Sequence, residues 1–255
     1  KSRIIFSADQ ADIEEMSGYI GGGRFSGSGG AAITGASVSS FRLSINGTDV
    51  TVPLPADFIT TGDARLEITG QRDVSSNLQI TIGGRVYARR SVYSKDIDLA
   101  NVVGARRERA ITSGGGGSLS PPRFDLIIEG RDALVVKNNI ADLTASVSLT
   151  LTGDANEPRL AGRITANSGT IFFRKERYVV QRGVLEFPPD TFIDPVLQLQ
   201  GETEIAGYQV FVTYNGPLKD SELAVLSVRS SPALPQADVV SLITTGSLTN
   251  SAGGI

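Results

Sequence analysis

The chain has 255 residues and a formal net charge of −3, so it can form one large or two ordinary domains, and it has no basic excess for nucleic acid. It contains no His and no Cys, which excludes disulfides, thiolate metal sites and catalytic sites of the Ser-His-Asp and Cys-His types. No segment approaches the roughly 20 apolar residues of a membrane helix. We find no catalytic motif, and we expect no metal or other cofactor and no nucleic-acid partner.

The first hundred residues predict short strands separated by turns, as the 29 glycines of the chain also indicate. Residues 4–7 are a strand candidate, whereas residues 9–16 predict one or two helical turns with Asp9 as the N-cap. Residues 39–46 alternate between apolar and polar side chains, and Asn46-Gly47 then signals a two-residue hairpin turn before a return strand at 49–53. Further alternating segments, each predicting a strand, lie at residues 64–70, 77–82 and 85–92.

The segment 105–122 interrupts this pattern. It contains the basic cluster Arg106–Arg109, then Gly114–Ser118 and Pro121-Pro122, a composition typical of a flexible loop or linker. The predicted organisation therefore has three parts: a stranded region at 1–104, the loop at 105–122 and a second stranded region at 123–255.

The second half contains the clearest strand of the chain, residues 143–152. Its odd positions are all apolar, from Leu143 to Leu151, and its even positions are all Ser or Thr. That alternation is the pattern of a strand with one buried face. Other strands are predicted at residues 124–129, 134–137, 159–167, 169–174, 177–181, 184–187, 196–205 and 208–214.

One amphipathic helix is predicted at residues 234–245. Pro235 suits its first turn, and Gly246 suits its C-terminal end. Val239, Leu242 and Ile243 would share its apolar face. We expect this helix to cover the end of the sheet's apolar interior, the alternative being that it docks on a partner.

The pattern as a whole, about fifteen one-sided strands and one or two short helices, predicts an all-β fold. Alternation favours antiparallel pairing, because parallel strands need long crossover connections and no crossover helix is evident. The apolar faces can be buried in a two-sheet sandwich, a closed barrel or one long sheet folded over on itself. The short connections favour the long sheet, antiparallel-dominated and with a hydrophobic interior.

The candidate site is the apolar side of these strands. It can be an ordinary sealed core, or it can be a lined groove for a hydrophobic ligand such as an acyl chain. Aliphatic side chains without a convergent polar group suit a ligand that is recognised by hydrophobicity alone. The candidate groove-lining residues are Leu43, Ile45, Leu66, Ile68, Leu78, Ile80, Leu126, Ile128, Val147, Leu149, Leu151, Ile164, Leu185, Phe187, Leu197, Leu199, Val210 and Val212.

Charged and glycine-rich clusters give weaker signals. Glu202 and Glu204 share one strand face, which indicates a solvated side of the sheet. Asp154–Glu157 lacks the ligand spacing of a calcium loop, so we interpret it as a turn. The glycine runs at 21–23 and 114–117 are not followed by Lys-Ser/Thr and a helix, so they are not phosphate-binding loops.

A series of short segments follows in order between Pro158 and Gly246. The segments are Leu160-Ala-Gly-Arg-Ile164, Ser168-Gly-Thr-Ile171, Arg182-Gly-Val-Leu-Glu-Phe187, Ile193-Asp-Pro-Val-Leu197, Gly207-Tyr-Gln-Val210, Gly216-Pro-Leu218, Ser231-Pro-Ala-Leu234 and Asp238-Val-Val-Ser-Leu242. In order and spacing this series resembles the C-terminal domain of the TamB family, the inner-membrane subunit of the bacterial translocation and assembly module, which belongs with the AsmA-like proteins. The resemblance is dense over residues 133–246 and looser over residues 18–70.

The resemblance implies a β-sheet folded into a taco-like groove with a hydrophobic interior. It implies a parent protein that is anchored in the inner membrane of a Gram-negative bacterium by an N-terminal helix and crosses the periplasm. Phospholipid acyl chains are the implied ligand, and a TamA-like outer-membrane barrel is the implied partner in outer-membrane protein and autotransporter assembly. The membrane anchor and the terminal segment that engages the barrel are expected outside the present sequence. No enzyme activity is implied, and the absence of His and Cys agrees with that.

Three functions are compatible with the sequence. The first is a lipid conduit, in which the apolar side holds acyl tails while headgroups stay in water. The second is a chaperone-like assembly module, in which the groove or its edge strand receives client strands by β-augmentation. The third is an inert structural spacer with a sealed core.

Overall fold

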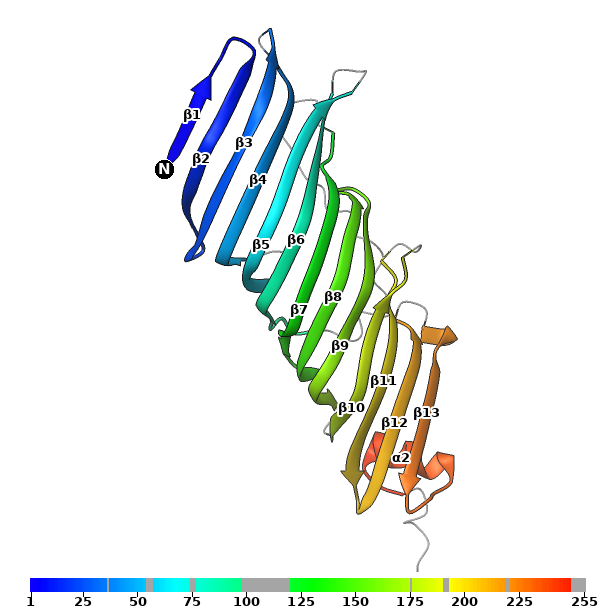
Figure 1. Ribbon diagram of the computed structural model, residues 1–255. Helices are drawn as coiled ribbons and strands as arrows, with labels where there is room; N and C mark the ends of the chain where they lie inside the picture. The colour runs from blue at the N-terminus through cyan, green and yellow to red at the C-terminus, as the bar shows by residue number, and fades with distance from the viewer. Residues whose placement is uncertain are drawn as a thin grey trace, which may run out of the picture.

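The computed structural model describes residues 1–35, 37–53, 57–73, 77–97, 120–174, 176–189, 193–218 and 221–248. Within these ranges, 13 strands form one sheet whose spatial order equals the sequence order, from β1 at one edge to β13 at the other (Figure 1). The two edges do not pair with each other, so the sheet is unclosed. The predicted all-β fold with one long, antiparallel-dominated sheet is therefore confirmed.

The strands and helices have the following bounds. The strands are β1 Ser2–Phe6, β2 Gln10–Ile20, β3 Gly23–Thr34, β4 Ser37–Val52, β5 Phe58–Arg72, β6 Leu78–Tyr93, β7 Arg123–Lys137, β8 Ala141–Asp154, β9 Pro158–Phe173, β10 Glu176–Phe187, β11 Val196–Ile205, β12 Tyr208–Pro217 and β13 Val225–Ser231. A 3-10 turn η1 at Ser221–Leu223 precedes β13, and the α-helix α2 at Gln236–Thr245 follows it.

One strand pair departs from the antiparallel pattern. β6 and β7 run parallel, with Ile82 opposite Phe124 and Val86 opposite Ile128. The expectation that parallel pairing is absent for want of crossovers is wrong at this point, because the chain between Tyr93 and Arg123 is long enough to return to the starting end of the sheet. The predicted loop at 105–122 falls in this connection and, up to residue 119, lies outside the described residues. The division of the chain there stays a prediction.

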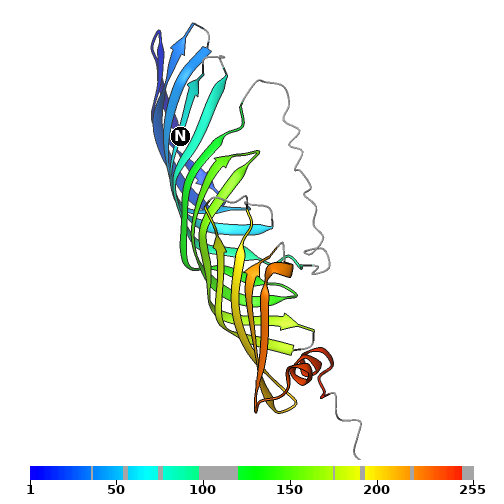
Figure 2. The same ribbon diagram turned by 90° about the vertical axis from the view of Figure 1, so that its right-hand side faces the viewer.

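Register shifts pass across the sheet from strand to strand. From β4 to β10 they fall between Gly47 and Val50 of β4, Thr61 and Gly62 of β5, Tyr87 and Ser91 of β6, Gly130 and Leu134 of β7, Thr144 and Ala145 of β8, and Val180 and Arg182 of β10. Such bulges bend a strand and increase its twist. We call this line of shifts the crease. Figure 2 shows the sheet as a strongly curved surface with α2 on its concave side.

The helix predicted at residues 9–16 is wrong, because residues 10–16 belong to strand β2. Ile13 of β2 lies opposite Ile4 of β1 and opposite Gly29 of β3. A helix of one or two turns is unstable by itself, whereas a strand at this place gains backbone hydrogen bonds on both sides. Pairing with two neighbours therefore overrides the local helix signal.

The hairpin turn predicted at Asn46-Gly47 is also wrong. Both residues lie inside β4, where Gly47 pairs with Phe25 of β3 and with Ala64 of β5. The glycine marks the start of the register shift in β4 and not a reversal of the chain. A glycine in a strand pattern can indicate a bulge as well as a turn, and here the ladders on both sides extend through it.

The predicted strand count of about fifteen exceeds the observed 13 because several long strands were divided at glycines. Gly83-Gly84, for example, lies within β6. Gly84 has a φ of 127°, and a Cβ added there would lie 2.1 Å from the carbonyl oxygen of Arg65. The residue is therefore needed for a close backbone approach inside the strand. Strand β13 was not predicted at all.

Candidate functional site

The register of the ladders places all of the predicted groove-lining residues on one face of the sheet. Residues directly opposite each other in neighbouring strands project to the same side. One such row consists of Ile45, Leu66, Gly84, Leu126 and Leu151, from β4 to β8. The remaining members follow at even spacing along these strands or in parallel rows. We call this the apolar face.

A second row extends the apolar face toward the C-terminus. Val147, Ile164, Leu185 and Leu197 lie opposite one another from β8 to β11. Val212 of β12 continues the face, because it pairs with Gly201, two residues beyond Leu199. The apolar face is thus continuous across the described strands from β4 to β12.

The apolar face is only partly buried. Leu149, Phe187 and Val210 are buried, and the other predicted lining residues are half-buried, with none exposed. In the part of the chain that the structure describes, no second sheet covers this face. A sealed sandwich core would bury most of these side chains fully. The arrangement is instead that of a single sheet whose own curvature shields its apolar side.

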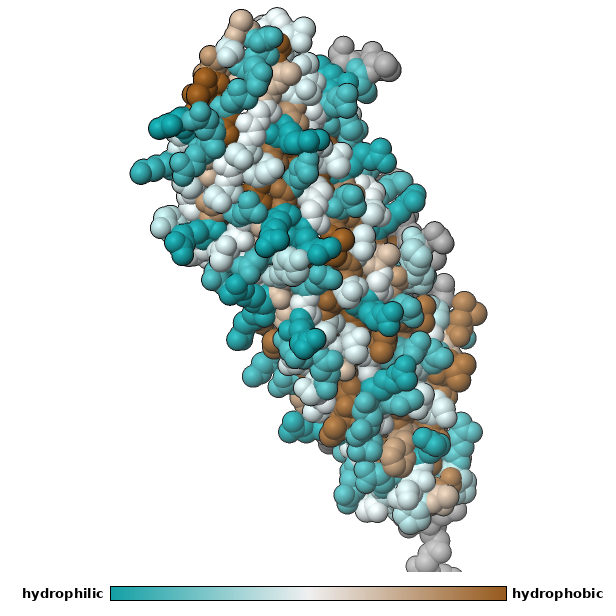
Figure 3. All heavy atoms as spheres, viewed as in Figure 1, coloured by the Kyte–Doolittle hydropathy of each residue, from teal (hydrophilic) through white to brown (hydrophobic). Residues whose placement is uncertain are grey.

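The opposite face is polar. Arg42, Ser44 and Asn46 alternate with the apolar residues of β4 and are exposed, as are Arg65 and Glu67 of β5. Figure 3 looks onto this face, with α2 behind the strands, and shows hydrophilic side chains distributed along its whole length. The sheet therefore separates water on its convex side from apolar side chains on its concave side.

Helix α2 packs on the apolar face at its C-terminal end. Val239 and Leu242, which are 1% and 0% exposed, form one cluster with Ile205 of β11 and Val210 of β12. Because α2 lies inside the curve of the sheet, this contact identifies the apolar face as the concave one (Figure 2). The prediction that the helix covers the end of the apolar interior is confirmed.

One further contact joins the helix to the sheet, and a glycine ends it. The Arg174 guanidinium, from the turn between β9 and β10, donates a hydrogen bond to the backbone carbonyl of Thr244 at 3.0 Å. A cation at this end complements the negative end of the helix dipole. Gly246 ends the helix in a left-handed conformation, with a φ of 77°, and its N–H bonds to the carbonyl of Leu242.

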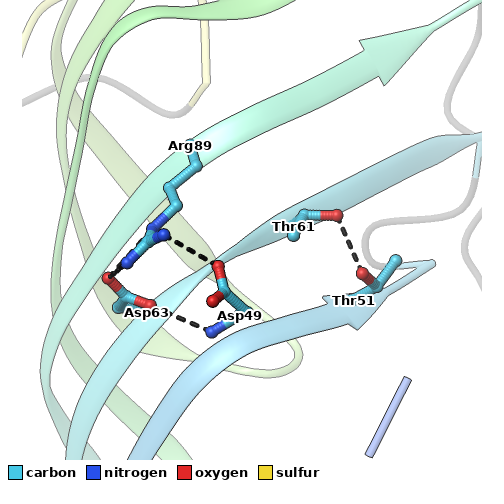
Figure 4. A network of polar contacts seen from close by, with 5 residues as sticks. All are labelled: Asp49, Thr51, Thr61, Asp63 and Arg89. Atoms are coloured by element: carbon cyan, nitrogen blue, oxygen red, sulfur yellow. Dashed lines mark hydrogen bonds and ion pairs between the residues drawn. The ribbon is translucent and has the colours of Figure 1, made fainter. Parts of the chain in front are cut away.

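The convex side of the crease carries polar cross-links that sequence reasoning missed. Arg89 of β6 contacts the Asp63 carboxylate at 2.6 Å and the Asp49 carboxylate at 2.8 Å, and the Asp49 N–H donates to Asp63 at 3.0 Å (Figure 4). The hydrogen bond from the Asp49 N–H and the contact with Arg89 lower the pKa of Asp63. The Asp63 carboxylate, and to a smaller extent the Asp49 carboxylate, raise the pKa of Arg89. Nearby, the hydroxyls of Thr51 and Thr61 are 2.8 Å apart.

The cross-links continue along the crease. Asn167 of β9 donates to Asp132 of β7 and to the Ser146 hydroxyl of β8, which also accepts the Asp132 N–H. Gln181 of β10 donates to Glu202 of β11 at 2.7 Å. We call this set, from Asp49 to Glu202, the polar seam. It joins strands at the places where their registers shift, and it therefore helps to fix the curvature of the apolar face.

Acidic side chains are the remaining candidates for metal binding among the described residues, because the chain has no His and no Cys. The described residues contain no group of three or more His, Cys, Asp or Glu side chains that could hold a metal ion. Asp154 closes a turn, as predicted: its carboxylate accepts the N–H groups of Asn156 and Glu157, which lower its pKa. The basic cluster Arg106–Arg109 lies outside the described residues.

A hollow of about 830 Å³ lies over β3 to β6, lined by residues such as Arg42, Thr69, Gln71 and Thr81. These side chains belong to the polar face, because Thr69 pairs with Arg42 and with Thr81. The hollow is therefore separate from the apolar face. Its lining mixes charged, amide and hydroxyl groups without a distinct pattern, and we assign it no role.

Comparison with known proteins gives a family match. The family model described as the TamB C-terminal domain matches residues 14–254, nearly the whole chain. No curated protein matches the chain. Among the described residues, no helix has the length and hydrophobicity needed to cross a membrane.

Proposed function

Because the chain belongs to the TamB C-terminal domain family, we propose that its apolar face conducts phospholipids across the periplasm between the inner and outer membranes. Membership implies a role in the translocation and assembly module and a place in the bacterial envelope. The family is a structural and transport family and not an enzyme family. The proposal therefore names the lipid as the ligand, the apolar face as its path, and the lining residues as its contacts.

The continuous, half-buried apolar face is the observation that carries this proposal. Transfer of an acyl chain from water to an apolar surface is favourable by about 0.8 kcal/mol per buried methylene. The lining side chains from β4 to β12 are chemically similar, so no single position binds an acyl tail much more tightly than the others. A tail can therefore move along the face without crossing a high free-energy barrier. The polar headgroup stays at the open side, in water.

The dimensions of the sheet suit a conduit. Neighbouring strands in a sheet lie about 4.8 Å apart, so 13 strands in sequence extend roughly 60 Å in the direction in which the rows of apolar residues run. A phospholipid would travel across the strands and not along them. In the parent protein we propose an inner-membrane anchor at one end of this path and a TamA-like outer-membrane barrel at the other.

Native mass spectrometry of the purified chain tests the proposal. We expect co-purifying phospholipid on the unaltered chain and much less on Leu151→Arg, because this half-buried residue lies in the middle of the apolar face. The matched control is Thr152→Arg, the next residue of β8, which is exposed on the polar face. A chain that carries no lipid but still supports lipid transfer between vesicles would contradict the proposal.

A second function is favoured by the open edges of the sheet. β1 exposes Ile4, Ile5 and Phe6, and β13 exposes Val225 and Leu226, with each strand paired on one side only. Unpaired edges with apolar side chains are templates for an added strand. In this role the chain would hold strands of outer-membrane protein clients. A photo-crosslinker at position 226 that captures clients, combined with a lipid-free groove, would favour this function over lipid transport.

A further inference from the structure

The hydroxyl group of Tyr178 is buried without a hydrogen-bond partner in the described part of the chain. The residue lies in β10, is 6% exposed and pairs with Ile171 of β9. A buried hydroxyl normally finds a partner, because the loss of its hydrogen bonds to water is otherwise uncompensated. An unpartnered donor at the edge of a candidate binding surface is a place where an acceptor atom of a ligand could bind.

Tyr178 projects onto the apolar face. A Cβ added to Gly201 of β11 would lie 3.4 Å from the Cβ of Tyr178, so both positions point to the same side of the sheet. Gly201 pairs with Val212, which is a member of the apolar face. The Tyr178 hydroxyl is therefore a polar group among the aliphatic side chains of that face.

The position of Tyr178 is at the end of the apolar face where α2 packs. Thr203 and Ile205 of β11, two and four residues beyond Gly201, are 8% and 4% exposed. Val239 and Leu242 of the helix cluster with Ile205 and Val210, and the Thr244 carbonyl of the helix accepts a hydrogen bond from Arg174 in the turn after β9. The helix thus crosses this end of the face. A lipid arriving along the face would reach the Tyr178 side chain where α2 closes the path, and its acceptor atom would have to displace the atoms that cover the hydroxyl.

The hydroxyl is a donor at neutral pH. Burial, and then the nearby Glu176 carboxylate, raise the pKa of Tyr178, so the group stays protonated. The ligand atom must accordingly be an acceptor. A phosphate would have to leave water for an apolar surface, which is costly unless a cation pairs with it. An ester carbonyl is a neutral acceptor and is covalently attached to the acyl chain, so it can enter such a surface.

We propose that the Tyr178 hydroxyl donates a hydrogen bond to an ester carbonyl of a diacyl glycerophospholipid whose chains lie on the apolar face. This inference rests on the proposed function, since it assumes that acyl chains bind there. It adds one polar contact, which would fix where the ester groups of the lipid lie on the apolar face. It also predicts that the site distinguishes ester-linked from ether-linked lipids, because an ether lacks the carbonyl oxygen.

The test compares two probes on the full 255-residue chain. They are a diacyl phosphatidylethanolamine and its dialkyl ether analogue of equal chain length, each used to displace a fluorescent fatty-acyl probe. We expect the unaltered chain to bind the ester lipid about three- to tenfold more tightly, the range for one hydrogen bond. Tyr178→Phe should lower the affinity for the ester lipid to that for the ether lipid and leave the ether affinity unchanged.

Tyr214→Phe is the matched control. Tyr214 lies on the same face, opposite Leu199, but its hydroxyl already donates to the carbonyl of Pro217 at 2.8 Å. This variant should keep the ester preference of the unaltered chain. Thermal melting checks that Tyr178→Phe folds, and we expect no loss of stability, because the change removes an unpartnered group.

The outcomes separate the two proposals. Equal binding of ester and ether lipid by the unaltered chain overturns the Tyr178 contact but leaves an acyl-binding groove intact. A parallel loss of both lipids in Tyr178→Phe also overturns it, because the ring would then act by shape alone. If neither lipid displaces the probe from any variant, the lipid-binding function itself fails, and the Tyr178 contact fails with it.

Discussion

Arg89 and Asp63 form an ion pair at 2.6 Å next to the register shift between β5 and β6. Arg89 also reaches Asp49 at 2.8 Å, and so connects β4, β5 and β6 on the convex side of the crease. All three strands have a register shift that belongs to the crease. A side chain that binds two carboxylates from neighbouring strands restricts how far those strands can rotate relative to each other.

We expect Arg89→Ala to loosen the crease without unfolding the sheet. The pair is exposed and screened by water, so the loss of global stability should be small. The Asp49 N–H, which donates to Asp63, should exchange with solvent faster, as measured by amide hydrogen exchange. Arg42→Ala is the control: it removes an exposed pair with Glu67 at 2.9 Å between the neighbouring strands β4 and β5, but away from the register shift. Equal effects of both changes would contradict a special role for Arg89.

The ion pair also predicts a pH dependence. The pKa of Asp63 in the folded chain is lower than its ordinary value of 3.8, so its contribution to stability is complete above that value. The contribution is lost as the pH falls through the lowered pKa, because protonation removes the carboxylate from Arg89 and from the Asp49 N–H. Acid titration followed by hydrogen exchange at Asp49 should show this loss, and Asp63→Asn should abolish it. An unchanged acid response in Asp63→Asn would contradict this assignment.

The backbone inside β9 gives a third prediction. Gly162 has a φ of 115°, and a Cβ added there would lie 2.2 Å from the carbonyl oxygen of Ser148. Gly162→Ala should therefore destabilise the chain by about 2–4 kcal/mol through backbone strain and a displaced ladder. Gly22→Ala is the control, since Gly22 has a φ of 85° in open space and should cost only about 1 kcal/mol. Urea unfolding measures both, and similar values would show that the contact with β8 is unimportant.

The sequence was most informative about which side of each strand is apolar. Leu143 to Leu151 alternates with Ser and Thr, and the structure places this alternation across the two faces of β8. The prediction of one shared apolar face succeeded for a physical reason: hydrogen-bonded neighbours keep their side chains on the same side. That these residues contact lipid stays a prediction.

The bending of the sheet could not be predicted in the same way. The crease depends on extra residues that the ladders tolerate, and Gly47, at the register shift of β4, was therefore interpreted as part of a turn. The polar seam depends on contacts between distant residues, such as Asn167 with Asp132. A weak signal was present, because Asp49 and Asp132 adopt positive φ and Asp is one of the few residues that tolerate it. The edge strand β13 was missed because its large apolar residues, Val225 and Leu226, are exposed and do not form an alternating face.

The attachment of α2 gives the last prediction. Leu242 is fully buried against Ile205 and Val210, so Leu242→Ala should weaken docking of the helix by about 2–5 kcal/mol through the cavity that it creates. The sheet itself should remain paired, because its ladders do not depend on the helix. Limited proteolysis and hydrogen exchange should therefore show faster opening of α2, together with little change in β4 to β8. Val240→Ala, at a position that is 44% exposed, should leave both regions unchanged. If Leu242→Ala instead destabilises the whole sheet, α2 is part of the core and does not act as a separate cover at the end of the apolar face.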